Sequence, residues 1–274
     1  MALVTCDFFS DVLGLSTTMT VVLPQRTHAQ IGMEGTERTG ATPTLYLLHG
    51  LSDDATTWSR RTSIERYATE LGIAVVMPQV AKSFYSDEVY GDPYWTFLTD
   101  ELPSLARSFF HLSDRREDTF VAGLSMGGYG AFQWALRKPQ DVAAAASLSG
   151  ALDVASLHEA VLERGEGFEV LRKVYGDTSV RGSDSDLLHL LSTADPATLP
   201  ALYQMCGTED FLLQSNLDFR DTAARHGVPL TVDLRPGDHS WGLWDTTIQD
   251  VLAWLPLAGS TQDPATQTPA TQEP

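Results

Sequence analysis

The run TFVAGLSMGGYGA, residues Thr119–Ala131, places a short apolar segment directly before a glycine-rich turn that holds one serine. Its first residues, Thr119–Ala122, predict a buried strand, and the residues after the glycines predict a helix. Between them, Gly123–Gly127 matches the pattern G-x-S-x-G. Because a strand that turns this sharply into a helix crowds its own backbone, small residues must flank Ser125. The pattern predicts an exposed serine hydroxyl at a helix N-terminus, where backbone N–H groups favour a developing negative charge.

Strand and helix patterns alternate on both sides of this run. Thr62 and Glu65 have the spacing of a capping box, and Gly72 is placed to end the helix that they start. Between Leu98 and Phe109 the apolar residues fall at helical spacing, which predicts a helix that Pro103 can kink. The other expected strands are Val4–Phe9, Thr18–Leu23, Thr44–Leu48, Ile73–Met77, Val142–Leu148, Leu202–Cys206 and Leu230–Leu234, and Trp241–Leu255 is the expected closing helix. This alternation predicts an α/β fold with a mostly parallel central sheet flanked by helices.

We expect one domain over residues 1–256. Residues 153–195 are polar and irregular, and they predict a small cap-like insertion over one end of the sheet. Residues 257–274 are rich in Pro, Thr and Gln, and Gly259–Pro274 holds no large apolar side chain. Because such a segment cannot offset the entropy of ordering, a disordered tail is predicted there.

Composition excludes several classes of protein. The 274 residues include 36 acidic and 18 basic side chains, a formal net charge of −18, which argues against nucleic acid or an anionic membrane as partner. The apolar runs are too short to span a bilayer, and no basic segment precedes an apolar one at the N-terminus. Two cysteines make neither a disulfide framework nor a zinc site. We therefore expect a cytoplasmic protein, and the sequence has no pattern that predicts a metal or a cofactor.

A serine hydroxyl is not ionised at neutral pH, so Ser125 needs a base, and the base needs an orienting acid. In this topology the acid and the histidine follow the serine, each in a loop after a strand. The strand Leu202–Cys206 leads to Asp210, and the strand Leu230–Leu234 leads to His239. We therefore assign Ser125 as nucleophile, His239 as general base and then acid, and Asp210 as the group that orients His239.

Other candidates compete for two of these roles. Glu209 and Asp238 are alternatives to Asp210, although Asp238 adjoins His239 and neighbouring side chains point apart in an extended loop. Only His239 follows a late strand. The other histidines are His28, His49, His111, His158, His189 and His226.

The tetrahedral intermediate of acyl transfer needs two hydrogen-bond donors. One is expected from the N–H of Met126, directly after the nucleophile, and the other from the N–H of Leu51, in the loop after Thr44–Leu48. Cys206 is interpreted as a buried structural cysteine rather than a second nucleophile. Aromatic residues in loops mostly pack in cores. A minority are expected to contact substrate, and the candidates are Trp58, Tyr85, Trp95 and Trp241.

The nucleophile run Arg115–Ala131 resembles the esterase D group of α/β-hydrolases, and within it the tributyrin esterase type. The resemblance covers about residues 1–256, and only the nucleophile run is specific on its own. The C-terminal tail departs from the family pattern, but this departure does not affect the assignment of the catalytic residues. The supporting pieces are Leu47–Ser52, Thr62–Ala68, Val76–Pro78, Ser83–Tyr85, Glu101–Pro103, Cys206–Asp210 and His239–Trp241 with Trp244.

The resemblance implies an α/β-hydrolase fold, a Ser125, Asp210 and His239 triad and a homo-oligomer. The function it favours is a serine carboxylesterase that hydrolyses short-chain acyl esters, small molecules, through an acyl-enzyme. The alternatives are a feruloyl or cinnamoyl esterase and a thioesterase of the S-formylglutathione hydrolase type. A scaffold that has kept the fold and lost activity is the non-enzyme alternative, and an intact set of Ser, His and Asp argues against it.

Overall fold

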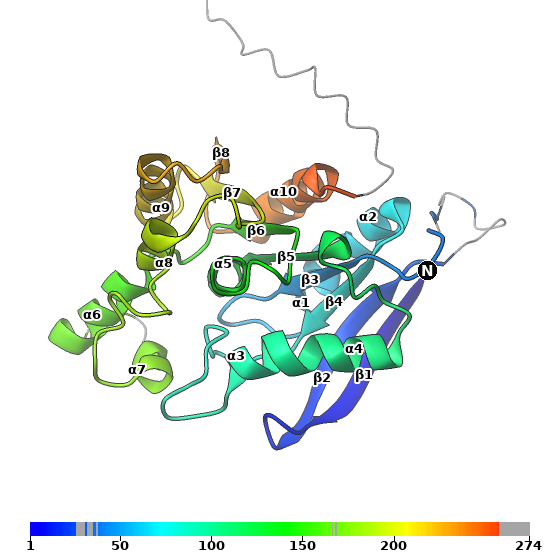
Figure 1. Cartoon of the computed structure of the whole chain (residues 1–274), viewed down its shortest axis with the longest axis horizontal. Helices are drawn as coiled ribbons and strands as arrows, with labels where there is room; N and C mark the ends of the chain where they lie inside the picture. The colour runs from blue at the N-terminus through cyan, green and yellow to red at the C-terminus, as the bar shows by residue number, and fades with distance from the viewer. Residues whose placement is uncertain (26–30, 32–34, 37, 166, 168, 258–274) are drawn as a thin grey trace, which may run out of the picture.

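A computed structural model describes residues 1–25, 31, 35–36, 38–165, 167 and 169–257. In this part of the chain a sheet with strand order β1-β2-β4-β3-β5-β6-β7-β8 runs through the middle of the molecule (Figure 1). The strands are β1 (Ala2–Ser10), β2 (Leu15–Leu23), β3 (Thr44–Leu48), β4 (Ala74–Pro78), β5 (Thr119–Leu124), β6 (Ala144–Leu148), β7 (Ala201–Gly207) and β8 (Thr231–Arg235).

The sheet is mixed at one end and parallel over the rest. β1 and β2 form an antiparallel hairpin, and β2 pairs with β4 in the antiparallel sense. All pairings from β4 through β3, β5, β6 and β7 to β8 are parallel. The predicted α/β-hydrolase fold is therefore confirmed. Because parallel strands run in one direction, the loops that follow β3, β5, β6, β7 and β8 all emerge at the same edge.

Helices cover both faces of the sheet. They are α1 (Thr57–Arg61), α2 (Ile64–Leu71), α3 (Tyr94–Thr96), α4 (Leu102–Phe109), α5 (Met126–Arg137), α6 (Val154–Arg164), α7 (Val170–Tyr175), α8 (Leu187–Thr193), α9 (Leu213–Arg225) and α10 (Trp241–Trp254). One apolar core lies between the sheet and helices α4, α5 and α9, and the other lies under α1, α2 and α10 (Figure 1).

Alternate side chains of each strand enter different cores, as the two-residue period of a strand requires. In β3, Tyr46 and Leu48 enter the core under α5, whereas Leu45 and Leu47 enter the core under α2 and α10. All five residues of β3 are buried. Such strands read as continuous apolar runs because both of their faces are covered.

Two local predictions differ in detail from the structure. Gly72 ends α2 in the left-handed conformation, as expected, but Ser63 occupies the N-cap position without a side-chain cap. Instead, the Thr62 hydroxyl accepts a hydrogen bond from the N–H of Ile64. Near Pro103, a π-helical turn over Phe97–Glu101 runs into α4. The wider turn accommodates a proline that has no N–H to donate and whose ring crowds the preceding turn.

The segment between β6 and β7 carries α6, α7 and α8, and α6 and α7 extend to one side of the sheet (Figure 1). A loop from elsewhere in the chain holds α7 in place. Glu88, whose side chain is buried, forms an ion pair with Lys173 of α7 at 2.8 Å, and the N–H of Val89 donates to the carbonyl of Val174. The limits of the cap-like insertion at 153–195 stay a prediction. The predicted tail lies outside the described residues from residue 258 onward.

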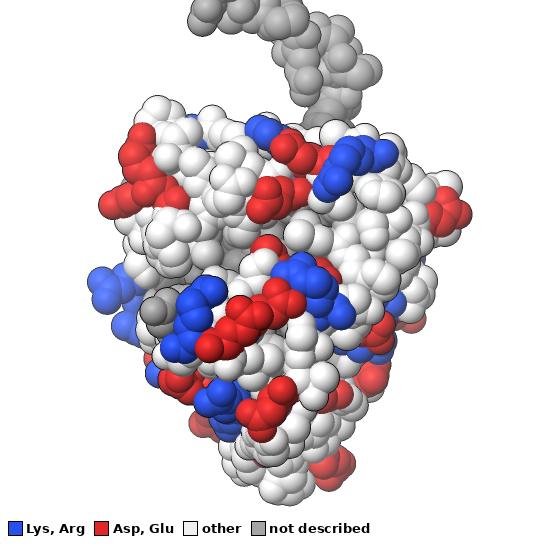
Figure 2. Space-filling view, turned by 90° about the vertical axis from the view of Figure 1, so that its left-hand side faces the viewer, with Lys and Arg blue, Asp and Glu red and all other residues white. Residues whose placement is uncertain are grey.

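Acidic and basic side chains are intermixed on the face that α6 to α9 form (Figure 2). Ion pairs on this side include Arg181 with Glu159 at 2.6 Å and Arg172 with Asp177 at 3.1 Å. Exposed pairs of this kind contribute little to stability. On this face, however, the arginines of these pairs neutralise part of the protein's excess negative charge.

The close contact between β3 and α5 gives the first testable prediction. A Cβ atom on Gly127 would lie 2.7 Å from the carbonyl carbon of Leu48 and 2.8 Å from the carbonyl oxygen of His49. Because both neighbours are backbone, Gly127→Ala is expected to lower the free energy of unfolding by at least ~2 kcal/mol in denaturant titration.

The matched control is Gly242→Ala in α10, where a new Cβ would meet no atom within 4 Å. This change should leave the stability unaltered or raise it by up to ~1 kcal/mol, since Ala favours helices over Gly. Equal effects of the two substitutions would contradict the packing argument.

Candidate active site

Ser125 lies at the turn between β5 and α5 in a strained backbone conformation, with φ 54° and ψ −116°. A side chain at positive φ outside the ordinary regions costs about 1–3 kcal/mol and persists only where surrounding structure imposes it. The N–H of Ser125 donates to the carbonyl of Leu148, and the carbonyl of Ser125 accepts from Ala151, both in the neighbouring β6 segment. The predicted sharp turn from strand to helix is therefore present, and the Ser125 hydroxyl lies at the start of α5.

Glycines surround this turn because backbone segments approach it closely. A Cβ on Gly123 would lie 2.8 Å from the Cβ of Leu48, and it would overlap with the carbonyl group of Gly127. On the opposite side, a Cβ on Gly50 would lie 3.8 Å from the Cβ of Ser125. The loop after β3 thus lies directly beside the nucleophile, where the sequence places the oxyanion donors.

Both predicted donor N–H groups belong to this junction. Met126 is the first residue of α5, and Leu51 follows Gly50 in the loop after β3. Within the described part of the chain, no residue accepts a hydrogen bond from either N–H. Such groups are available to an anionic ligand, as the first N–H groups of a helix are in general.

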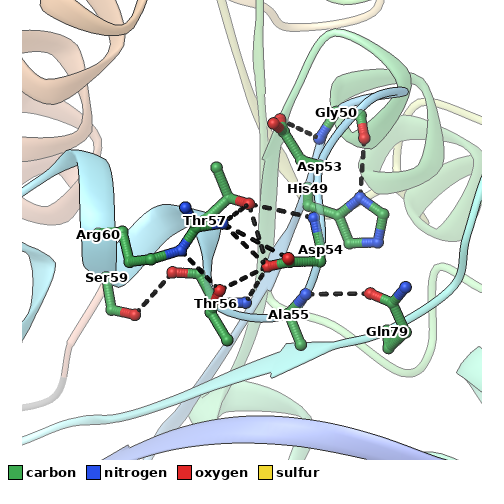
Figure 3. A network of polar contacts seen from close by, with 10 residues as sticks. All are labelled: His49, Gly50, Asp53, Asp54, Ala55, Thr56, Thr57, Ser59, Arg60 and Gln79. Atoms are coloured by element: carbon green, nitrogen blue, oxygen red, sulfur yellow. Dashed lines mark hydrogen bonds and ion pairs between the residues drawn. The ribbon is translucent and has the colours of Figure 1, made fainter.

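Buried hydrogen bonds fix the shape of the loop after β3 (Figure 3). The carboxylate of Asp53 accepts from the N–H of Gly50 at 3.2 Å, and the Nδ1–H of His49 donates to the carbonyl of Gly50 at 2.8 Å. The Nε2 atom of His49 accepts from the N–H of Val80 at 3.3 Å. Burial lowers the pKa of His49, so the ring is neutral and has this one tautomer. His49 is therefore a supporting residue of the loop and not a candidate base.

The next residues of the loop form a second network (Figure 3). The carboxylate of Asp54 accepts from the N–H and the hydroxyl of Thr56 and from the hydroxyl of Thr57. These bonds, led by the Thr56 hydroxyl, lower the pKa of Asp54 to about 2. The carboxylate stays ionised at neutral pH and holds the turn that leads into α1.

Asp210 and His239 meet at the same edge of the sheet. The Nδ1–H of His239 donates to Oδ2 of Asp210 at 2.8 Å, and Oδ1 of Asp210 accepts from the N–H of Leu212 at 2.8 Å. The Asp210 side chain is fully buried, whereas that of His239 is 19% exposed. This bond fixes the proton on Nδ1 and leaves Nε2 of the neutral ring free to accept a proton.

The carboxylate of Asp210 remains ionised in spite of its burial. Desolvation is the largest influence and raises its pKa, but hydrogen bonds from His239, Leu212 and Ser149 together bring the pKa below its usual value. An ionised acid beside the imidazole stabilises the imidazolium that forms when His239 takes up a proton.

Of the three candidate acids, Asp210 is the one that bonds His239. Glu209 is exposed, and its carboxylate accepts from the N–H of Gly237, in the loop that carries His239. The N–H of Glu209 donates to the carbonyl of Gly237 at 3.0 Å in return. Glu209 therefore ties the loop of the histidine to the loop of the acid. The side chain of Asp238 is exposed to solvent.

Ser149, directly after β6, connects the acid to the helix behind the histidine. Its hydroxyl accepts from Nε1 of Trp244 at 3.1 Å and bonds the carboxylate of Asp210. The ring of Trp244 stands edge-on to the imidazole of His239, with centroids 4.8 Å apart. One buried hydroxyl thus links β6, β7 and α10 beneath the imidazole.

Comparison with known proteins agrees with this arrangement. Residues 10–255 match the family described as "Putative esterase". The chain belongs to this esterase family. The carboxylic ester hydrolase predicted from the sequence is therefore confirmed at the level of the family.

The relatives include an acetyl esterase from Caldicellulosiruptor saccharolyticus, 29% identical over 93% of this chain and 98% of its own length. Among solved structures, the substrate-bound serine hydrolase FphF of Staphylococcus aureus is 36% identical, with a TM-score of 0.82 over 93% of this chain and 98% of that chain. The S-formylglutathione hydrolase FrmB of Staphylococcus aureus is also 36% identical, with a TM-score of 0.79 and the same coverage. The resemblance to the esterase D group is confirmed, and the tributyrin esterase type stays a prediction.

The four aromatic residues expected to contact substrate have different environments in this esterase. Trp58 and Tyr85 are buried, and they donate hydrogen bonds to the carbonyls of Leu48 and His49. They therefore support the loop after β3 from beneath. Trp241 is partly exposed and packs edge-on against Trp244 with centroids 5.3 Å apart. Among the four, only Trp241 combines partial exposure with contact to the residues around His239.

The prediction for Trp95 is not supported by the structure. Its ring packs against the guanidinium of Arg137, 4.0 Å away, at the last residue of α5. Ser125 precedes the first residue of this 12-residue helix. At 1.5 Å per residue the two ends of the helix are about 18 Å apart. The sequence could not reveal this because tertiary packing sets the position of α3, the short helix that carries Trp95.

Two residues at the site, Ser149 and Phe211, were not predicted from the sequence. Ser149 supports the acid and the histidine, and Phe211 lies against the imidazole of His239 with centroids 4.6 Å apart. Glu209 was predicted only as an alternative acid, and it instead ties the loop of the histidine to the loop of the acid. The signal for Phe211 was present, since it follows Asp210 directly. Ser149 had a weaker signal, a serine at the end of a predicted strand.

In the described residues, no group of three or more His, Cys, Asp and Glu side chains is placed to hold a metal ion, and no helix is long and apolar enough to cross a membrane.

The environment of Cys206 gives the second prediction. Burial in β7 raises the pKa of its thiol to about 12, so at pH 8 about one molecule in ten thousand carries the reactive thiolate. Iodoacetamide at pH 8 should leave Cys206 unmodified in the folded protein, by mass spectrometry of peptides, and should leave ester hydrolysis unchanged.

A Cys6→Ser background removes the other cysteine, which is free and partly exposed. In denaturant Cys206 should be alkylated, which shows that the reagent reaches it once the fold opens. Loss of activity in step with alkylation of Cys206 in the folded protein would contradict its assignment as structural.

Proposed function

We propose that the chain is a serine carboxylesterase that hydrolyses short-chain acyl esters through Ser125, His239 and Asp210. The observation that carries the proposal is the 2.8 Å bond from His239 to a fully buried, ionised Asp210, at the same sheet edge as the strained serine turn. A binding module would need neither the strain at Ser125 nor an imidazole with an oriented proton.

The reaction follows from these groups. Nε2 of His239 takes the proton of Ser125 as Oγ attacks the ester carbonyl, and the N–H groups of Leu51 and Met126 hold the resulting oxyanion. His239 then gives the proton to the alkoxy oxygen, and the alcohol leaves. Water, deprotonated by the same Nε2, attacks the acyl-enzyme and releases the acid, which restores Ser125. The ionised Asp210 stabilises the imidazolium in both halves of the cycle.

Preference for a short acyl group is supported by the acetyl esterase relative and by the resemblance to the tributyrin esterase type. The S-formylglutathione hydrolase type is the second candidate because FrmB is 36% identical over nearly the whole chain. Two exposed carboxylates beside the histidine, Glu209 and Asp238, and a net charge of −18 disfavour an anionic thiol as leaving group. A feruloyl or cinnamoyl esterase is the third candidate. A cytoplasmic location and a homo-oligomer remain predictions from the sequence.

Removal of the nucleophile is the direct test. Ser125→Ala should lower kcat/KM on p-nitrophenyl acetate about a thousand-fold or more, because the acyl-enzyme cannot form. The variant should keep the circular dichroism spectrum of the wild type. The matched control, Ser108→Ala on the exposed face of α4, should keep the wild-type rate. A folded Ser125→Ala variant with wild-type activity would refute the proposed mechanism.

The substrate class needs a second measurement. We expect kcat/KM to fall along p-nitrophenyl esters from acetate to laurate, and butyrate esters to exceed both S-formylglutathione and methyl ferulate. A higher kcat/KM on S-formylglutathione would replace the carboxylesterase with the thioesterase, while the roles of Ser125 and His239 would stand.

A further inference from the structure

Phe211 is an exposed aromatic residue in contact with the proposed catalytic base. The residue is 67% exposed, and its ring centroid lies 4.6 Å from that of His239. Single exposed apolar residues are common on protein surfaces. The position of this one, directly against the imidazole, is what requires an explanation.

The chain on both sides of Phe211 is anchored. Asp210 has a fully buried side chain that accepts the N–H of Leu212, and Leu212 is itself buried in the core. The direction of Phe211 is therefore imposed by the turn that presents the acid. The ring extends into solvent instead of packing into the core.

The imidazole has two aromatic neighbours with different roles. Trp244 is buried and bonded to Ser149, so it forms a fixed support beneath His239. Phe211 contacts the same imidazole and is open to solvent. A molecule that reaches the exposed part of His239 can therefore contact the phenyl ring of Phe211.

The chemistry decides which part of the ester lies there. Nδ1 of His239 is bonded to Asp210, so Nε2 must deliver the proton to the alkoxy oxygen of the leaving alcohol. This oxygen has to lie within hydrogen-bond reach of Nε2, which places the alcohol part of the ester, and not the acyl part, beside the imidazole.

We propose that Phe211 is a specificity-determining residue that packs against the alcohol part of the ester and favours flat, apolar, uncharged alcohols. This inference rests on the proposed function. Aromatic rings contribute contact area and a preference for stacked partners. Two exposed carboxylates disfavour anionic alcohols at the same place: Glu209 lies two residues before Phe211, and Asp238 directly precedes His239.

The order of the reaction adds a condition. The alcohol leaves when the acyl-enzyme forms, so Phe211 has no substrate to contact during deacylation. Its removal must therefore change acylation, which kcat/KM measures, and leave the breakdown of a common acetyl-enzyme unchanged.

The experiment compares acetates that share the acyl group and differ in the alcohol: 2-naphthyl, phenyl and methyl acetate. Phe211→Ala should lower kcat/KM about ten-fold on 2-naphthyl acetate and leave methyl acetate within about two-fold of the wild type. Phe211→Tyr, which keeps the flat ring, should retain the wild-type preference. The steady-state rate that follows the 2-naphthol burst, which reports deacylation, should be the same in all variants.

The matched control is Phe9→Ala, which removes another exposed phenylalanine, 59% accessible, from β1 at the far edge of the sheet. It should leave all three acetates unchanged. An equal fall on all acetates after Phe211→Ala would mean that the ring only shields the His239–Asp210 pair, and it would overturn the inference. No fall on 2-naphthyl acetate would overturn it as well.

These results are separable from failure of the proposed function. If the wild type released no alcohol from any acetate, or if Ser125→Ala matched the wild type, the esterase mechanism itself would fail. A wild type that depends on Ser125, with a Phe211→Ala variant that shows no selectivity for the alcohol, would overturn the inference about Phe211 alone.

Discussion

The site depends on one close approach of backbone, in which the end of β3 lies directly against the first turn of α5. Gly127 provides the space, and Ser125 takes the positive φ that the turn requires. This strain costs about 1–3 kcal/mol. Burial offsets it, because α5 is enclosed from Met126 to Leu136 and a single buried side chain such as Phe132 contributes about 1.5–3 kcal/mol. The helix holds the serine where an unsupported turn would relax.

The sheet order explains why the remaining residues meet at this turn. β5 and β8 are separated by β6 and β7, and neighbouring strands lie about 4.8 Å apart. The loop after β8, which carries His239, must therefore extend roughly 14 Å across the sheet edge toward β5 to approach Ser125. Two contacts support that path. Glu209 ties the histidine loop to the end of β7, and Trp244 reaches Ser149 at the end of β6. Short polar contacts of supporting residues thus set the position of the imidazole.

Much of this could be predicted from the sequence, because backbone constraints leave local patterns. Glycines around Ser125 predicted the turn, continuous apolar runs predicted buried parallel strands, and the order of Ser125, Asp210 and His239 predicted one edge of the sheet. Contacts between distant segments leave no local pattern. The sequence could not show that Trp241 lies near the histidine whereas Trp95 packs against the C-terminal end of α5. Both are tryptophans with polar neighbours in the sequence. It also gave no indication that Phe211 would be exposed.

The most direct test of this site is covalent labelling with a fluorophosphonate, which reacts with a serine that a neighbouring base activates. We expect one adduct in wild-type protein, on the peptide that contains Ser125, and a large loss of labelling rate in His239→Ala and Asp210→Asn variants that remain folded. An adduct on another serine, or labelling of Ser125 at the wild-type rate without His239, would contradict the convergence of these residues into one site.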